Sequence, residues 1–249
     1  MKTVLITGCS SGFGLETARH FLERDWKVIA TMRNPREDIL PPSDNLRLLA
    51  LDVTDAEDIA RAVADAGPID VLVNNAGIGW FNALEGTSME RVHQIFATNV
   101  FGTIAMTKAV VPQFRERGAG VVINVSSSTT LLPLHFLSVY TASKAAVNAF
   151  TESLALELES FGARARLVIP GRAPDTSFSS TAQATVGKEG GVPEAYAELV
   201  KTIFARYAAA PQDQVTHARD VAEVIWRAAT DPAAPVRMPA GADAVALSA

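Results

Sequence analysis

The sequence has very little of several features that would define other classes of protein. Its 249 residues include a single cysteine, Cys9, and four histidines. One cysteine cannot form an intramolecular disulfide, and these residues show no spacing typical of metal ligands. The chain has neither ~20 continuous apolar residues, as a membrane span would need, nor the apolar region and cleavage site of a secretion signal. We therefore expect a cytoplasmic protein with no metal and no membrane contact.

A concentration of positive charge is also missing. The chain has 22 Lys and Arg against 27 Asp and Glu, which gives a net charge of −5. Because no basic patch is interleaved with aromatic residues, nucleic acid is not expected as a partner, whereas a bound anionic cofactor remains compatible. The length and the apolar content of 48% are sufficient for one sizeable core.

Short apolar runs of strand-forming residues alternate with amphipathic segments. The runs are 4–7, 28–31, 46–51, 71–73, 121–125 and 166–169. The amphipathic segments lie near 15–24, 56–66, 89–114, 139–161, 193–207 and 219–229. This alternation predicts an α/β fold, a doubly wound parallel sheet (Rossmann-like) with helices on both faces. No repeat or linker divides the chain, which indicates a single domain over residues 1–249.

One segment, residues 171–191, departs from this alternation. It is rich in Gly, Pro, Ser and Thr and shows weak periodicity. A long irregular segment in a compact domain is usually a functional lid, although it can be a surface insertion without a role. Because it follows the sixth predicted strand, on the side where such sheets bind ligands, we interpret it as a loop that forms a lid on the substrate side.

A glycine-rich segment follows the first predicted strand and opens the first helix. It reads Thr7-Gly8-Cys9-Ser10-Ser11-Gly12-Phe13-Gly14. Glycines at such a junction permit a tight turn and a close approach of the backbone to a pyrophosphate, and the helix start favours an anion. A glycine cluster can also be a tight turn only. The predicted cofactor-binding residues here are Gly8, Ser10, Ser11, Gly12, Phe13 and Gly14.

The end of the second predicted strand indicates which dinucleotide is bound. An NAD enzyme usually has an acidic residue there, which holds the ribose 2′-hydroxyl. This strand continues into Met32-Arg33-Asn34, with no acid. A guanidinium suits a 2′-phosphate, so Arg33 favours NADP(H) over NAD(H). The alternative is that Arg33 is a solvated loop residue.

Two further segments follow strands at the same expected edge of the sheet. Asp52 and Val53 follow the third strand, where they could touch an adenine. Asn74-Asn75-Ala76-Gly77 follows the fourth. Asparagine side chains can tie loop backbone together, and Gly77 permits close approach of a cofactor, although this segment alone could be a structural turn. We add Asn75, Ala76 and Gly77 to the cofactor site.

Tyr140 and Lys144 are four residues apart, which places both side chains on one face of a helix. A phenol is a poor acid at neutral pH, because its ordinary pKa is about 10. A neighbouring ammonium favours the phenolate, so we expect Lys144 to lower the pKa of Tyr140 towards neutrality. The pair is a candidate general acid/base for a carbonyl or an alcohol.

Together these motifs resemble the short-chain dehydrogenase/reductase family in its short, single-domain form. The resemblance covers nearly the whole chain. Its motifs are Thr7-Gly8-Cys9-Ser10-Ser11-Gly12-Phe13-Gly14, Asn74-Asn75-Ala76-Gly77, Thr98-Asn99-Val100, Ser127 after Ile123-Asn124-Val125-Ser126, Tyr140 with Lys144, and Pro170-Gly171. It implies an NADP-dependent carbonyl reductase or alcohol dehydrogenase and, commonly, a homodimer or homotetramer built through the helices that hold Asn99 and Tyr140.

The resemblance also implies a role for individual residues. Tyr140 resembles the acid/base, and Lys144 its partner, which also binds the nicotinamide ribose; both residues also belong to the implied cofactor site. Ser127, chosen over its neighbours by the family spacing to Tyr140, resembles the residue that orients the substrate oxygen. Asn99 resembles the anchor of a water chain that reaches Lys144. Pro170 and Gly171 complete the cofactor site, whereas Thr176 lies about one place later than the family's threonine.

The expected substrate is a small carbonyl or alcohol compound with a hydrophobic body. The candidate pocket residues are mostly apolar, and half of them could equally belong to the core. They are Trp80, Phe81, Leu131, Leu132, Leu134, His135, Phe136 and Phe178. Two other activities stay open, an NAD-dependent alcohol dehydrogenase and a sugar-nucleotide epimerase or dehydratase, as does a non-catalytic NADP sensor on the same fold.

Overall fold

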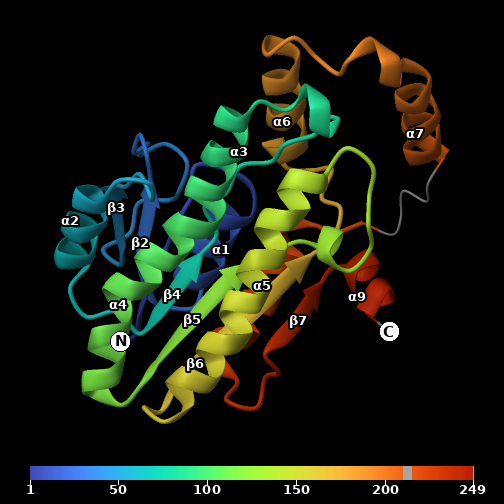
Figure 1. Ribbon diagram of the computed structural model, residues 1–249. Helices are drawn as coiled ribbons and strands as arrows, with labels where there is room; N and C mark the ends of the chain where they lie inside the picture. Colours follow the sequence, from blue (N-terminus) through green and yellow to red (C-terminus); the bar gives the residue numbers. More distant parts are fainter. Residues whose placement is uncertain (210–214, 249) are drawn as a thin grey trace.

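A seven-stranded parallel sheet forms the centre of the molecule in the computed structural model, which describes residues 1–209 and 215–248 (Figure 1). Its strand order is β3-β2-β1-β4-β5-β6-β7. The strands are β1 (Thr3–Ile6), β2 (Lys27–Met32), β3 (Leu46–Ala50), β4 (Val71–Asn74), β5 (Gly120–Val125), β6 (Ala163–Pro170) and β7 (Arg237–Ala240). The chain runs outward from β1 to β3 and then returns to β4, so the predicted doubly wound sheet is confirmed.

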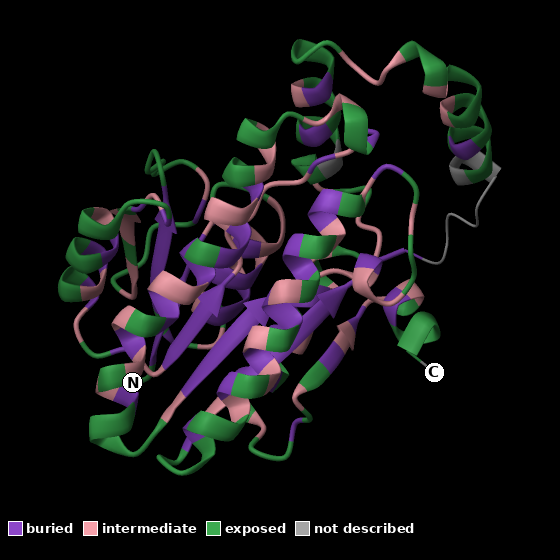
Figure 2. Ribbon diagram, in the orientation of Figure 1, coloured by how far each residue is buried: buried purple, intermediate pink, exposed green. Residues whose placement is uncertain are grey.

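Helices cover both faces of this sheet. They are α1 (Gly12–Leu22), α2 (Ala56–Ala66), α3 (Met89–Phe96), α4 (Thr103–Arg117), α5 (Ser138–Glu159), α6 (Ser177–Lys188), α7 (Ala197–Ala209), α8 (Ala218–Thr230) and α9 (Ala242–Ser248). Alternate residues of β1 point to opposite faces. Val4 and Ile6 pack with α1 and α8, whereas Leu5 packs with α2, α4 and α5. Figure 2 shows the central strands buried along most of their length between the two layers of helices, whereas β3 at one edge is only partly buried.

The predicted helix over 89–114 is present but interrupted. A π-helical turn, Ala97–Gly102, lies between α3 and α4 and contains Asn99. A π-turn inserts an extra residue into the helix and changes the direction of the side chains that follow. The apolar periodicity of the sequence predicts the helix, but it does not reveal this turn.

Within the described residues, the stretch Met89–Arg117 is long and apolar enough to cross a membrane by length and composition alone. Met106, Val110 and Phe114 are fully buried in it, and they pack against the sheet. The core helix of a globular domain passes the same test, and packing on the sheet accounts for the apolar residues here.

The expectation that residues 171–191 are irregular is wrong, because α6 occupies Ser177–Lys188. The sequence feature that could have predicted this helix is a sparse set of apolar residues at helical spacing, Phe178, Ala182 and Val186. The surrounding segment is rich in Ser and Thr, which obscures it. Ala182 and Val186 are buried. The sequence analysis also missed β7, which is short, lies at the edge of the sheet and contains Pro239, a residue tolerated mainly in edge strands.

Candidate active site

The glycine-rich turn is packed closely against the end of β4. Gly8 has a φ of +75°, and a Cβ atom there would lie 2.8 Å from Ala76 Cα. A Cβ on Gly14 would collide with the carbonyl oxygen of Gly8. Neither position has space for a side chain, so both glycines are required by the geometry of the turn.

Asn75 ties this turn to the segment after β4. Its Nδ2 donates to the carbonyl oxygens of Thr7 (2.9 Å) and Gly8 (3.1 Å). In return, Thr7 Oγ1 accepts hydrogen bonds from the backbone N–H groups of Asn75 and Ala76, both at 3.0 Å. The two predicted cofactor motifs therefore form one rigid unit.

The start of α1 fits a phosphate group. Ser11 is the N-cap residue in extended conformation, but its side chain makes no capping hydrogen bond. Ser10 and Ser11 are exposed, whereas Phe13 packs against the core and anchors the helix. Backbone N–H groups left without a side-chain cap at a helix start, beside glycines, suit an anion. The residues here fit the pyrophosphate of a dinucleotide.

Arg33 lies beside this turn. Cys9 N donates to Thr31 O at 2.9 Å, which places the turn against the end of β2, two residues before Arg33. Arg33 is exposed and makes no hydrogen bond or ion pair with any described residue, whereas Arg36 on the same loop pairs with Asp38 at 2.7 Å.

The other predicted cofactor residues are more strongly engaged in local structure. Asp52 Oδ1 accepts hydrogen bonds from N and Oγ1 of Thr54 at 2.9 and 2.7 Å. Val53 is buried, with its side chain against Gly102. Pro170 ends β6, and Gly171 N donates to Thr216 Oγ1 at 3.0 Å. These contacts fix the loops at the carboxyl edge of the sheet.

Ser127 and Tyr140 meet through a hydrogen bond between their side chains. Ser127 ends the extended chain after β5, and its Oγ also accepts a hydrogen bond from Thr129 N at 3.3 Å. The neighbouring Ser126 is buried, and its hydroxyl donates to Asn148 Oδ1 instead. The structure therefore brings Ser127, and not Ser126, to Tyr140.

Lys144 and Asn99 both lie close to Gly77. Lys144 Nζ donates to Val125 O at 2.9 Å and lies 6.0 Å from the centre of the Tyr140 ring. A Cβ on Gly77 would lie 3.2 Å from Asn99 Oδ1 and 3.5 Å from Lys144 Nζ. Gly77 therefore joins the cofactor segment to both polar side chains.

Both the oxygen and the nitrogen of the Asn99 side-chain amide form hydrogen bonds, to the backbone of Ile78 and to Ser143. Its Oδ1 accepts from Ile78 N at 2.8 Å, and its Nδ2 donates to Ile78 O and to Ser143 Oγ, both at 3.0 Å. Ser143 Oγ in turn donates to Tyr140 O at 2.6 Å. The sequence analysis missed Ser143, although it lies three residues after Tyr140 and thus on the same side of the helix.

The expectation that Lys144 lowers the pKa of Tyr140 is wrong for this structure. Burial raises the pKa of Tyr140 to about 12, and the hydrogen bond from Ser127 offsets this only in part. Burial also lowers the pKa of Lys144 to about 8. Removing both groups from water disfavours their charged forms, and this effect exceeds their mutual interaction. Tyr140 is therefore a neutral phenol at neutral pH.

The candidate pocket residues fall into different environments. Trp80 and Phe136 are buried in two small apolar clusters, while Leu132 and His135 are exposed. Leu131 packs against a third buried cluster and Phe81 against Phe136; Leu134 is half-buried. Phe178 alone among them makes a recorded ring contact with Tyr140.

Thr176 and His217 also have defined places. Thr176 lies against Gly12, where a Cβ would be 3.5 Å from Thr176 Cβ. His217 is the N-cap residue of α8, and its Nδ1 lies 2.5 Å from Asp175 Oδ2. The backbone N–H of His217 donates to Asp220 Oδ2 at 2.8 Å, which ties the residue to the first turn of α8.

Comparison with known proteins identifies the family of this chain. The family profile described as short chain dehydrogenase matches residues 2–186. The chain is 38% identical over 240 residues to the uncharacterized oxidoreductase YusZ of Bacillus subtilis, covering 92% of this chain and 85% of that protein. It is 38% identical over 201 residues to 3-ketodihydrosphingosine reductase of Bacteroides thetaiotaomicron, a match that covers 79% of this chain and 72% of that protein. The chain belongs to the short-chain dehydrogenase family of oxidoreductases.

Solved structures share the whole fold. A short-chain dehydrogenase from Streptomyces avermitilis is 33% identical with a TM-score of 0.80, covering 99% of this chain and 90% of that one. A closed serine dehydrogenase complexed with NADP+ has 29% identity and a TM-score of 0.78, covering 96% and 94%. A 3-ketoacyl-(acyl-carrier-protein) reductase from Brucella melitensis complexed with NADH is 27% identical with a TM-score of 0.79, and the match covers 96% of each chain.

Proposed function

We propose that this protein is an NADP(H)-dependent oxidoreductase that interconverts a carbonyl compound and a secondary alcohol, with Tyr140 as general acid/base. One observation carries the proposal. Ser127 bonds the Tyr140 hydroxyl, while Lys144 and Asn99 converge on Gly77, next to the glycine-rich turn. A non-catalytic NADP sensor would need the glycine-rich turn to bind the cofactor, but it would not need these four side chains together.

The residues of the chain divide the work of carbonyl reduction. The dihydronicotinamide cofactor supplies a hydride when it is bound. Ser127 and Tyr140 hold the carbonyl oxygen by hydrogen bonds, and the neutral phenol of Tyr140 donates its proton as negative charge develops on that oxygen. Tyr140 then regains a proton from solvent by way of Lys144 and a water chain anchored at Asn99. Lys144 also binds the ribose and stabilises the transient phenolate.

Arg33 supports the preference for NADP(H). It is exposed beside the phosphate-binding turn, without a partner among the described residues, and no acid occupies the end of β2. A structural neighbour is complexed with NADP+, but another is complexed with NADH, so an NAD-dependent alcohol dehydrogenase is the second candidate.

The substrate side of the site supports a hydrophobic compound. Apolar rings from three segments meet there, because Phe81 contacts both Phe136 and Phe204. The relative from Bacteroides is named as a reductase of a sphingosine derivative, which is such a compound. We propose that residues 171–191, including α6, act as a lid on this side.

The test is consumption of NADPH and NADH with a panel of aldehydes, cyclic ketones and steroid-like ketones, beside Tyr140→Phe. We expect turnover with NADPH that falls at least about a hundredfold in the variant, because the proton donor is lost. NADPH binding should persist, since the phenol is not part of the phosphate cradle. Tight cofactor binding with no turnover of any panel member would favour the non-catalytic sensor.

A further inference from the structure

The first turn of α6 lies across the candidate active site. Ser177 Oγ donates to Ser11 Oγ at 3.2 Å, and Thr176 lies against Gly12. The start of α6 is therefore held to the phosphate-binding turn. Phe178 is the next residue, and its position follows from these two contacts.

The ring of Phe178 lies between Tyr140 and Gly79. The centres of the Phe178 and Tyr140 rings are 5.8 Å apart at an angle of 56°. A Cβ on Gly79 would lie 2.6 Å from Phe178 Cε1 and 2.9 Å from Cζ, closer than real Cβ contacts. Only glycine at position 79 leaves room for the ring.

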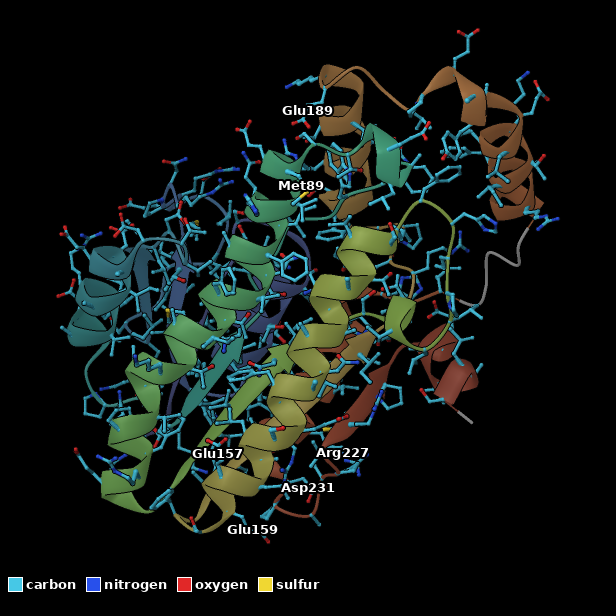
Figure 3. All side chains as sticks on the ribbon, in the orientation of Figure 1. Met89, Glu157, Glu159, Glu189, Arg227 and Asp231 are labelled. Atoms are coloured by element: carbon cyan, nitrogen blue, oxygen red, sulfur yellow. The ribbon has the colours of Figure 1, made fainter. Side chains whose placement is uncertain are left out.

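The other end of α6 is anchored as well. Glu189, directly after the helix, forms an ion pair with Arg91 of α3, and Val186 packs with Trp80 and Ile95. Figure 3 shows Glu189 above the start of α3, which is marked by Met89. Contacts at both ends of the helix therefore fix where the Phe178 ring lies.

We propose that Phe178 is a specificity-determining residue, whose ring covers one side of Tyr140 and limits the size of the substrate substituent on that side. Phe178 is 39% exposed, so a compound entering beside Tyr140 meets this ring. The carbonyl must still reach Ser127 and Tyr140. The substrates that fit have one large apolar substituent and one small one, as in aldehydes and methyl ketones. This inference rests on the proposed acid/base role of Tyr140.

A double-mutant cycle tests the proposal with Phe178→Ala, Gly79→Ala and the double variant. The probes are acetophenone, with one small substituent, and benzophenone, with two large ones, each reduced with NADPH. Phe178→Ala should raise the ratio of kcat/KM for benzophenone to that for acetophenone by about tenfold or more, because removing a ring opens the crowded side. Gly79→Ala should also raise the ratio, since its Cβ displaces the ring, yet it should add nothing in the Phe178→Ala background.

A second readout does not depend on turnover. The chain has only three tyrosines, so ¹³C labelling of their Cζ atoms lets NMR follow the ionisation of Tyr140, assigned with Tyr140→Phe. Burial holds the pKa of Tyr140 near 12. Phe178→Ala should let the phenol ionise at lower pH, because it exposes the ring to water. Phe161→Ala, another partly exposed phenylalanine that lies outside the proposed lid, should change neither readout.

The outcomes separate this inference from the proposed function. An equal effect of Gly79→Ala in both backgrounds, or no effect of Phe178→Ala on the titration or the ratio, would overturn the role of Phe178. A different result would instead overturn the proposed chemistry. Neither the wild-type protein nor any variant would turn over any substrate, yet Gly79→Ala would shift the Tyr140 titration only while Phe178 is present. Phe178 would then still be the residue that covers Tyr140.

Discussion

At the scale of single residues, burial has the largest effect on the candidate chemistry. Tyr140 and Lys144 are both almost fully buried, at 7% and 5% exposure, and burial moves their pKa values in opposite directions. The phenol stays protonated at neutral pH, as a proton donor must. The ammonium of Lys144 has a pKa only slightly above neutral pH, so at pH 7 the site contains a buried cation that burial disfavours.

Replacing Lys144 should therefore stabilise the fold at neutral pH. The pKa of Lys144 falls from 10.5 to about 8 in the folded protein. Between these pH values Lys144 is protonated in the unfolded chain but not in the folded protein, which costs the folded state free energy. This cost reaches its full size below pH 8, where the folded protein must also bury the charged ammonium. Lys144→Met should raise the free energy of unfolding at pH 7 by about 2–3 kcal/mol, at 1.36 kcal/mol per pKa unit less one hydrogen bond.

This gain should shrink as the pH rises towards 10.5, because the unfolded lysine also loses its charge there. Urea denaturation at several pH values measures it, with the exposed Lys108→Met as the control. A gain that does not depend on pH would contradict the assignment to the buried charge. Activity should be lost in the same variant.

Arg33 gives a second prediction at this scale. Arg33→Ala should weaken NADPH binding by about 2 kcal/mol, roughly thirtyfold, because a charged hydrogen bond to a phosphate is lost, and should leave NADH binding nearly unchanged. Calorimetric titration of both cofactors measures this. Arg36→Ala on the same loop is the matched control, since Arg36 pairs with Asp38. Equal losses for the two cofactors would remove the argument for NADP(H).

At the scale of elements, a buried polar band joins two strands to two helices. Asn74 Nδ2 donates to Thr107 Oγ1 on α4 at 3.0 Å and to Asn124 Oδ1 on β5 at 2.9 Å. Asn124 Nδ2 donates to Thr151 Oγ1 on α5 at 2.8 Å. The band lies beneath the candidate site and fixes α5, which holds Tyr140, relative to β4 and β5.

Asn124→Leu should break this band and destabilise the fold by about 1–3 kcal/mol, because it removes one buried hydrogen bond from Asn74 Nδ2 and one from Thr151 Oγ1, while their bonds to Thr107 Oγ1 and Val147 O remain. Thermal denaturation measures the change. Asn34→Leu, at an exposed position, should shift the midpoint little. A stable Asn124→Leu variant would mean that the neighbouring groups find other partners, and the band would not be required for stability.

At the scale of the whole molecule, α4 and α5 cover the same face of the sheet (Figure 1). Leu156 on α5 is 74% exposed, and Phe101, just before α4, is 63% exposed. Large apolar side chains this exposed suit an interface between copies of the chain. We therefore propose that the oligomer implied by the family resemblance forms through the helices that hold Asn99 and Tyr140.

Leu156→Glu should therefore lower the mass of the particle in light scattering, because a buried charge at an interface is strongly disfavoured. Leu84→Glu is the matched control, since Leu84 is similarly exposed but lies outside these helices. An unchanged mass in Leu156→Glu would place the interface elsewhere, and a monomeric wild-type protein would exclude it altogether.

The sequence by itself determined the parallel sheet, most of its helices and the family of the chain. Apolar periodicity reports which face of each element is buried, and the glycine-rich turn depends on residues adjacent in sequence, so both are readable without coordinates. The spacing of Tyr140 and Lys144 on one helix face is readable for the same reason.

The tertiary structure decided what depends on contacts between distant segments. The bond from Asn99 to Ser143 and the packing of Phe178 against Gly79 each join residues far apart in the chain, and the π-turn that holds Asn99 is not visible in the apolar periodicity. The pKa of Tyr140 changed in the direction opposite to the one that the Tyr140–Lys144 pair predicts. Burial is a property of everything packed around a side chain, and no local spacing in the sequence contains that information.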